Sequence, residues 1–253
     1  MIRQIFTAFF IWFPLVCASN AQMTYDQFLE NHIKAMGGAE ALENILSVQS
    51  KMIIMEDVNP VTNDGTALDG TYMANRDGQM RVDIYVDGNR VFTEALSSMT
   101  EGWRQNGEGE TVEPLSEDGS KALQKSIHSN LYALHELEGL GYKVEFQGEQ
   151  TLMEKSYYAV DLTSPLGKFE RQFFDKQTYL KAATMDESAL HVDVDPTKVL
   201  SVSTNTDYKM VGGVMRSFAG EVINVRENKV IQTFELRHIE FNVPQDKSKY
   251  HKP

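Results

Sequence analysis

The chain has 253 residues, of which 36 are acidic and 24 basic, and its formal net charge is −12. This acidic balance argues against nucleic acid or an anionic membrane surface as a partner. The only cysteine is Cys17, so the chain beyond it can hold neither a disulfide nor a thiolate metal site.

The first 21 residues have the layout of a secretory signal peptide. A basic start precedes the apolar run Ile5–Val16, which is shorter than the ~20 residues that a membrane-spanning helix needs. Ser19–Ala21 is a small-x-small cleavage site. We therefore expect cleavage after Ala21 and a periplasmic location for residues 22–253. No low-complexity linker divides them, and we expect a single domain.

Three segments show the spacing of amphipathic helices. The first, Thr24–Met36, begins with a Thr-x-x-Gln capping box and ends at a Gly-Gly stop. A second, short helix is expected over Ala39–Leu46. A third is expected over Ser120–Leu137, after the polar loop Gly107–Gly119. We expect the apolar faces of these helices to pack on a sheet.

The remaining segments alternate apolar and polar residues, which is the period of half-buried strands. Turn signals such as Asp77-Gly78 and Asp87-Gly88 separate neighbouring runs. The last run changes phase, and a β-bulge near Arg237-His238 would allow this. The expected strands are Val48–Glu56, Leu68–Asn75, Met80–Val86, Arg90–Ser97, Gly102–Asn106, Tyr142–Gln147, Tyr157–Thr163, Lys168–Phe174, Leu180–Asp186, Val199–Tyr208, Val214–Phe218, Glu221–Arg226 and Val230–Val243.

Together these elements predict an α+β fold that is mainly antiparallel. About 11–13 strands would form a strongly curved sheet, with two or three helices covering its concave face. The chain also contains 12 methionines. Flexible Met side chains suit a surface that accepts variable apolar shapes, although ordinary core filling explains them as well.

One cluster has metal-like residue types. His191, Asp193 and Asp195 would share one face of a strand and could supply nitrogen and oxygen ligands. Because Pro196 follows in a polar connection, we favour a solvated loop or edge strand, and we expect no metal and no cofactor. The chain has no Gly-x-Ser-x-Gly elbow and no glycine-rich phosphate loop. We expect no enzyme, with a hydrolase left open because catalytic triads assemble across folds.

Four stretches follow one another in a recognisable order. IKAMGGAEALENILSVQSKMII joins a helix with a Gly-Gly end to a short helix and a strand. VEFQGEQTLMEKSYYAVDLTSPLGKFERQFFDKQTYLKAATM carries a Gly-Glu step, a Tyr-x-Val strand and a Phe-Asp-x-x-Thr-x-Leu turn, and DYKMVGGVMRSF and IEFNVPQDKSKYHKP follow. In this order the chain resembles the LolA/LolB-like superfamily of periplasmic lipoprotein carriers, in particular its outer membrane lipoprotein-sorting branch. Glu101-Gly102-Trp103 departs from the family's Asp-Gly-x-x-x-Trp.

This resemblance implies an unclosed β-barrel with the helices as a lid over an apolar cavity. It implies a periplasmic carrier that holds the acyl chains of a lipoprotein or lipid for transport toward the outer membrane. Inner- and outer-membrane envelope proteins would be further partners, nucleic acid would not, and we expect a monomer. An envelope interaction or sensor module with a packed core, and a periplasmic hydrolase, remain as alternatives.

Strand parity selects the residues expected to line such a cavity. A register error of one residue would turn several of them outward. The candidates are Met52, Ile54, Met80, Val82, Ile84, Phe92, Trp103, Leu131, Phe146, Tyr158, Val160, Phe169 and Phe173.

Overall fold

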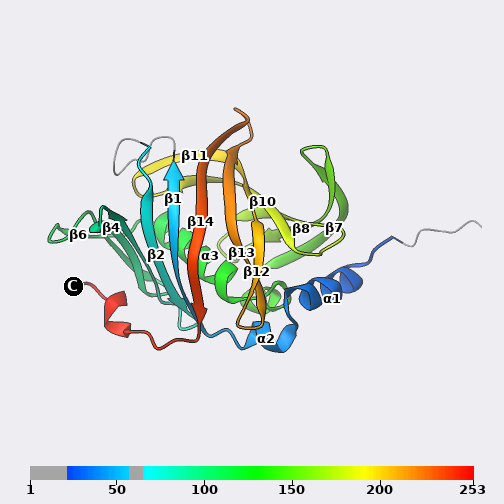
Figure 1. The fold of residues 1–253 in the computed structure, drawn as a ribbon, viewed down its shortest axis with the longest axis horizontal. Helices are drawn as coiled ribbons and strands as arrows, with labels where there is room; N and C mark the ends of the chain where they lie inside the picture. Colours follow the sequence, from blue (N-terminus) through cyan, green and yellow to red (C-terminus); the bar gives the residue numbers. More distant parts are fainter. Residues whose placement is uncertain (1–21, 57–64) are drawn as a thin grey trace, which may run out of the picture.

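The computed structural model describes residues 22–56 and 65–253. The expected signal peptide, residues 1–21, lies outside this part of the chain. Among the described residues, no helix is both long enough and apolar enough to cross a membrane. The described chain forms one large curved sheet with helices packed against it (Figure 1).

Fourteen strands of the described chain belong to this sheet, in the spatial order β6-β5-β4-β3-β2-β1-β14-β13-β11-β10-β9-β8-β7, with β12 beside β13. All their pairings are antiparallel, and the ends of the row, β6 and β7, do not pair with each other. The predicted mainly antiparallel, unclosed and strongly curved barrel is thereby confirmed. The strands are β1 (Ser47–Glu56), β2 (Leu68–Asn75), β3 (Met80–Val86), β4 (Asn89–Ser98), β5 (Glu101–Gln105), β6 (Val112–Pro114), β7 (Lys143–Leu152), β8 (Lys155–Thr163), β9 (Phe169–Phe174), β10 (Lys181–His191), β11 (Asp195–Thr204), β12 (Thr206–Val211), β13 (Val214–Asn224) and β14 (Lys229–Phe241).

The strand count exceeds the predicted range for local reasons. The expected loop 107–119 contributes the short strand β6, and the expected strand 199–208 divides between β11 and β12. Conversely, the two strands expected on either side of Gly220 form one strand, β13. A Cβ atom on Gly220 would lie 2.1 Å from the Thr204 carbonyl oxygen, so this glycine permits a close approach between strands and does not end one.

The two halves of the sheet meet where β1 pairs with β14. Lys51 lies opposite His238, and Met52 lies opposite Leu236, so Arg237 is the extra residue of a β-bulge. The predicted bulge near Arg237-His238 is confirmed. It returns Ile239 to the concave face that Leu236 also occupies, and both side chains line the same cavity.

Three α-helices lie in the described chain: α1 (Tyr25–Met36), α2 (Ala39–Glu43) and α3 (Glu117–Leu131). Thr24 and Gln27 form the predicted capping box of α1. Helix α3 begins earlier than expected because Ser116 accepts a hydrogen bond from the Gly119 amide. It also ends earlier, and two short 3-10 turns, Leu134–Glu136 and Glu138–Leu140, follow it.

Helix α3 lies inside the curve of the sheet (Figure 1). Its buried face of Leu123, Ile127 and Leu131 packs in one cluster with side chains of β2 and β3 such as Tyr72 and Met80. A second cluster forms where Phe28 of α1 packs against aromatic side chains of β7, β8 and β9. These two clusters hold the helices over the concave face.

The C-terminal segment covers the opposite face of the sheet. Trp103 of β5 is almost fully buried and donates its indole N–H to the Tyr250 carbonyl oxygen over 2.9 Å. The Tyr250 side chain is itself completely buried. Trp103 therefore anchors the last residues of the chain to the convex side.

We expect Trp103→Phe to lower the free energy of unfolding by roughly 1–3 kcal/mol. The substitution removes one hydrogen bond, leaves the Tyr250 carbonyl group buried without its donor, and leaves a small cavity. Urea unfolding followed by circular dichroism measures the change. An unchanged midpoint would show that the C-terminal segment is held by other contacts.

Candidate functional site

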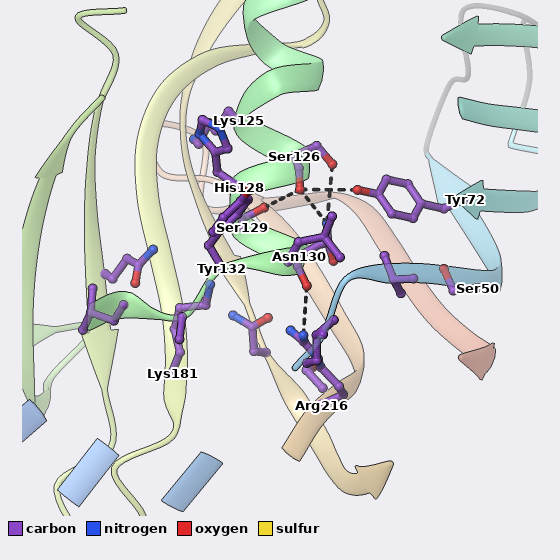
Figure 2. Close-up of a pocket in the computed structure, with 18 of the residues that line it drawn as sticks. Ser50, Tyr72, Lys125, Ser126, His128, Ser129, Asn130, Tyr132, Lys181 and Arg216 are labelled. Atoms are coloured by element: carbon purple, nitrogen blue, oxygen red, sulfur yellow. Dashed lines mark hydrogen bonds between the residues drawn. The ribbon is translucent and has the colours of Figure 1, made fainter. Parts of the chain in front are cut away.

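A cavity of about 630 Å³ lies between α3 and the concave face of the sheet. Strands β1, β2 and β3 line one side of it, strands β9, β10, β12 and β13 line the other side, and β14 lies between them. Figure 2 shows α3 passing through the view, with Tyr72 on one side and Lys181 on the other.

The wall formed by β1, β3 and β14 is mainly apolar. Two polar side chains, Ser50 of β1 and Gln232 of β14, also face the cavity there. The apolar side chains of this wall are Val48, Met52, Ile54, Met80, Val82, Phe234, Leu236 and Ile239. Tyr72 of β2 also faces the cavity, and its hydroxyl group donates to the Ser126 carbonyl oxygen of α3 over 3.4 Å (Figure 2). This wall can remove acyl or other aliphatic groups from water.

The other wall is polar. Helix α3 contributes Ser126, His128 and Asn130, whereas β10 and β13 contribute Lys181 and Arg216. Arg216 Nη2 donates to the Asn130 carbonyl oxygen over 2.9 Å (Figure 2). His128 Nδ1 lies 3.0 Å from the Tyr142 hydroxyl group, and burial lowers the pKa of His128. The imidazole is therefore neutral at pH 7.

A group of three charges lies beside this wall. Lys125 Nζ is 2.7 Å from a carboxylate oxygen of Glu170 and 2.7 Å from one of Asp186. Burial alone would lower the pKa of Lys125, but the two carboxylates outweigh it and raise that pKa. Burial alone would likewise raise the pKa of Glu170, and Lys125 lowers it below its usual value. With their ordinary charges, the three side chains carry a net charge of −1.

The structure brings five of the thirteen candidate residues together around the cavity: Met52, Ile54, Met80, Val82 and Leu131. Ile84 and Phe92 pack beside them in a separate cluster under Leu68. Phe146, Tyr158 and Val160 belong to the cluster around Phe28 of α1. A ligand-binding role for any of these residues stays a prediction.

Three candidates lie away from the concave face. Trp103 lies under the C-terminal segment, and Phe173 packs with Ala159, Ala183 and Val202. Phe169 is half exposed. On β9 the residues opposite the inward-facing Tyr158, Val160 and Leu162 of β8 are Phe174, Gln172 and Glu170, and these three line the cavity.

Sequence reasoning missed the cations that line the cavity, including Lys181 and Arg216, which form no ion pair among the described residues. One signal could have found Arg216. In Val214–Phe218 it shares strand parity with Val214, which is completely buried, so the alternation itself turns a charged side chain inward. A cation at an inward position of a strand needs either an acidic partner or a function. Lys181 begins its strand, and its position gives no comparable signal.

The three metal-like residues lie in one turn, where His191 is opposite Asp195, but their side chains contact different partners. His191 Nε2 lies 3.0 Å from Glu56, and Asp195 accepts a hydrogen bond from the Thr197 amide. Asp193 accepts from the Ser116 amide at the start of α3. The turn between β10 and β11 thus attaches to the N-terminal end of the helix that covers the cavity, where a carboxylate is electrostatically favoured.

Glu94 lies near that attachment, on the concave side of β4 opposite Val82 and Arg104. Burial, with a smaller contribution from Asp193, raises the pKa of Glu94 from 4.5 to about 7. Since the folded pKa lies above the unfolded value, Glu94 favours the folded state most at pH below 4.5. This contribution is lost as the pH rises through 7.

We therefore expect Glu94→Gln to stabilise the protein at pH 8 by roughly 3 kcal/mol and to have little effect at pH 4. Chemical unfolding at both pH values measures the two differences. The control is Glu30→Gln, at an exposed position of α1. Equal effects of the Glu94 substitution at the two pH values would contradict the raised pKa.

No protein-family model and no curated protein matches this sequence. Solved structures do match. They include a DUF1329 family protein from Desulfovibrio piger ATCC 29098, with a TM-score of 0.60, 10% identity, and coverage of 89% of this chain and 96% of the other. A LolA superfamily protein from Nitrosomonas europaea matches with a TM-score of 0.59, 11% identity, and coverage of 91% and 98%. A putative outer membrane lipoprotein-sorting protein domain from Vibrio parahaemolyticus matches with a TM-score of 0.54, 10% identity, and coverage of 88% of this chain and 95% of the other. At these identities the likeness concerns the fold, and it confirms the fold that the resemblance implied.

Proposed function

We propose that this protein binds the acyl chain of a lipid or lipoprotein in the cavity under α3 and carries it through the periplasm toward the outer membrane. One observation carries the proposal: the concave face and α3 form a cavity of about 630 Å³ with one mainly apolar wall. This volume lies within the range of ~300–1,000 Å³ that is typical of small-molecule sites.

The energetics favour an acyl chain as the occupant. Each methylene group removed from water contributes about 0.8 kcal/mol, so ten methylene groups contribute about 8 kcal/mol. Association costs at least about 4 kcal/mol in lost freedom of motion, so ten methylene groups leave at most about 4 kcal/mol, a dissociation constant of about 1 mM. A longer acyl chain buries more methylene groups and binds more tightly. A carrier needs a site that binds its cargo reversibly, and it does not need catalytic groups.

Two further observations support the finer parts of the proposal. The layout of residues 1–21 favours export into the periplasm. Two of the structures that share the fold are named as a LolA superfamily protein and an outer membrane lipoprotein-sorting domain. We propose on the same grounds a monomer that is not an enzyme and that exchanges cargo with envelope proteins of the inner and outer membranes.

Native mass spectrometry of the exported protein, followed by lipid extraction, tests the proposal. We expect a mass above that of the protein alone and an acylated molecule in the extract. A clean protein mass, together with no uptake of added fatty acid or lipopeptide, would overturn it. Co-purification of a stoichiometric protein without lipid would favour an interaction module.

A further inference from the structure

Lys181 is a cavity-lining cation without a counter-ion. It begins β10, and the Tyr208 hydroxyl group donates to its backbone carbonyl oxygen over 2.6 Å. Within residues 22–56 and 65–253, neither an ion pair nor a hydrogen bond involves its ammonium group. Its closest acid, Glu170, already pairs with Lys125. Burial lowers the pKa of Lys181, as expected for a cation that lacks a partner.

Arg216 is the second such cation. It donates to the Asn130 carbonyl oxygen over 2.9 Å, and its guanidinium carbon lies 5.1 Å from the centre of the Phe241 ring. Its buried Nε has no acceptor among the described residues, and none of the ion pairs found there includes it. Burial lowers its pKa to about 10. Contact with the end of α3 gives Arg216 a structural role, but that contact uses only one of its donors.

The charges around the cavity do not balance. With their ordinary charges, Lys125, Glu170 and Asp186 together carry −1, whereas Lys181 and Arg216 together carry +2. His32 and His128 are neutral at pH 7, because burial lowers the pKa of both. One negative charge is therefore missing. A buried cation is stable only when it is paired, so a bound anion would stabilise this arrangement.

The cations and the apolar wall belong to one cavity. In Figure 2, Lys181 and Arg216 both lie below the C-terminal turn of α3, with Lys181 on the side away from Tyr72 and Arg216 directly beneath Asn130. Met52, Ile54 and Val82 line the apolar wall of the same space. A molecule with a charged end and an aliphatic chain can contact both regions at once.

We propose that Lys181 and Arg216 form a binding site for the singly charged anionic head group of an amphiphile, a carboxylate or a phosphodiester, whose acyl chain lies along the apolar wall. This inference rests on the proposed acyl-chain function and deepens it. A planar guanidinium group and an ammonium group together suit the oxygens of either head group. A neutral acylated cargo would leave both cations unpaired.

Competition against a neutral fluorescent probe in the delipidated, exported protein tests this assignment. The competitors are hexadecanoate, hexadecanol and a lysophospholipid with a single phosphodiester. We expect hexadecanoate to bind at least tenfold tighter than hexadecanol. Its carboxylate can form charge-assisted hydrogen bonds with Lys181 and Arg216, whereas the neutral hydroxyl group of hexadecanol leaves both cations unpaired. The comparison between carboxylate and phosphodiester identifies the head group, and inorganic phosphate alone should not displace the probe.

Substitutions test whether these cations cause the preference for the acid over the alcohol. Lys181→Met should remove most of the difference between acid and alcohol, and Lys181→Arg should keep it. Lys143→Met is the matched control, because Lys143 pairs with Glu145 at an exposed position of β7. Thermal unfolding of each variant checks that it is folded. If Lys181→Met is not folded, Arg216→Gln, which also removes one positive charge, should reduce the difference between acid and alcohol.

Three binding outcomes would contradict one or both of these proposals. Equal binding of hexadecanoate and hexadecanol to the unaltered protein would overturn the anion site and leave the acyl-binding function standing. Binding of neither would overturn both. Displacement of the probe by inorganic phosphate as effective as that by hexadecanoate would show a site for free anions and overturn the head-group assignment.

Discussion

Leu236→Trp is expected to weaken the binding of an acyl ligand by roughly 30-fold. Leu236 lies on β14, directly opposite Met52 of β1, and faces the cavity. The larger indole ring would occupy the space of about three methylene groups, and the lost burial amounts to roughly 2 kcal/mol. Titration with a fluorescent fatty acid measures the affinity.

The matched control places the same new side chain one residue away. Glu235 is exposed on the other face of β14, so Glu235→Trp adds an indole ring outside the cavity. We expect this variant to bind as the unaltered protein does. If both tryptophan variants bind with unchanged affinity, the cavity under α3 is not the ligand site.

The largest loss of stability is expected from Arg76→Met. Its Nε donates to the Ile45 carbonyl oxygen over 2.7 Å, and its Nη2 donates to the Leu131 carbonyl oxygen over 2.8 Å. An ion pair of 2.6 Å with Glu136 and a contact of 4.3 Å with the Tyr132 ring complete its environment. One guanidinium group therefore ties the ends of α2 and α3 to the turn after β2.

Removing this group leaves two carbonyl oxygens and a largely buried carboxylate without their donor. We expect the free energy of unfolding to fall by about 3 kcal/mol and the melting temperature by roughly 6–12 °C. Arg226→Met is the control, because the Arg226 side chain is 72% exposed and its ion pair with Glu187 contributes little. Equal melting temperatures of the two variants would show that the contacts of Arg76 contribute little to the stability of the fold.

The sequence predicted the strands far better than it predicted which face lines the cavity. Alternation reports that a strand has two different faces, and even the bulge at Arg237 was evident from a change of phase. On β9, however, the polar residues Glu170 and Gln172 face inward and Phe173 faces outward. Hydrophobicity chose the wrong face there because this part of the cavity is polar.

Trp103 illustrates a second limit. It lies on the convex face and is buried only because the C-terminal segment returns to cover it. That contact joins residues 147 positions apart in the chain, so no local pattern reports it. The lack of an acidic partner for Lys181 is equally invisible in the local sequence, because it depends on which acids of other strands reach its side chain.

The seam between β1 and β14 has a consequence for how the chain reaches its fold. Around the seam, the Leu46 amide donates to the Asn242 side chain across 196 positions of sequence. Most other strand pairs join consecutive strands, and such hairpins form quickly. The pairing of β1 with β14 brings together residues from both ends of the chain. We therefore expect it to be the slow step of folding. Until Asn242 has been synthesised, each half of the sheet exposes an open edge, and we expect the chain to be prone to aggregation during that interval.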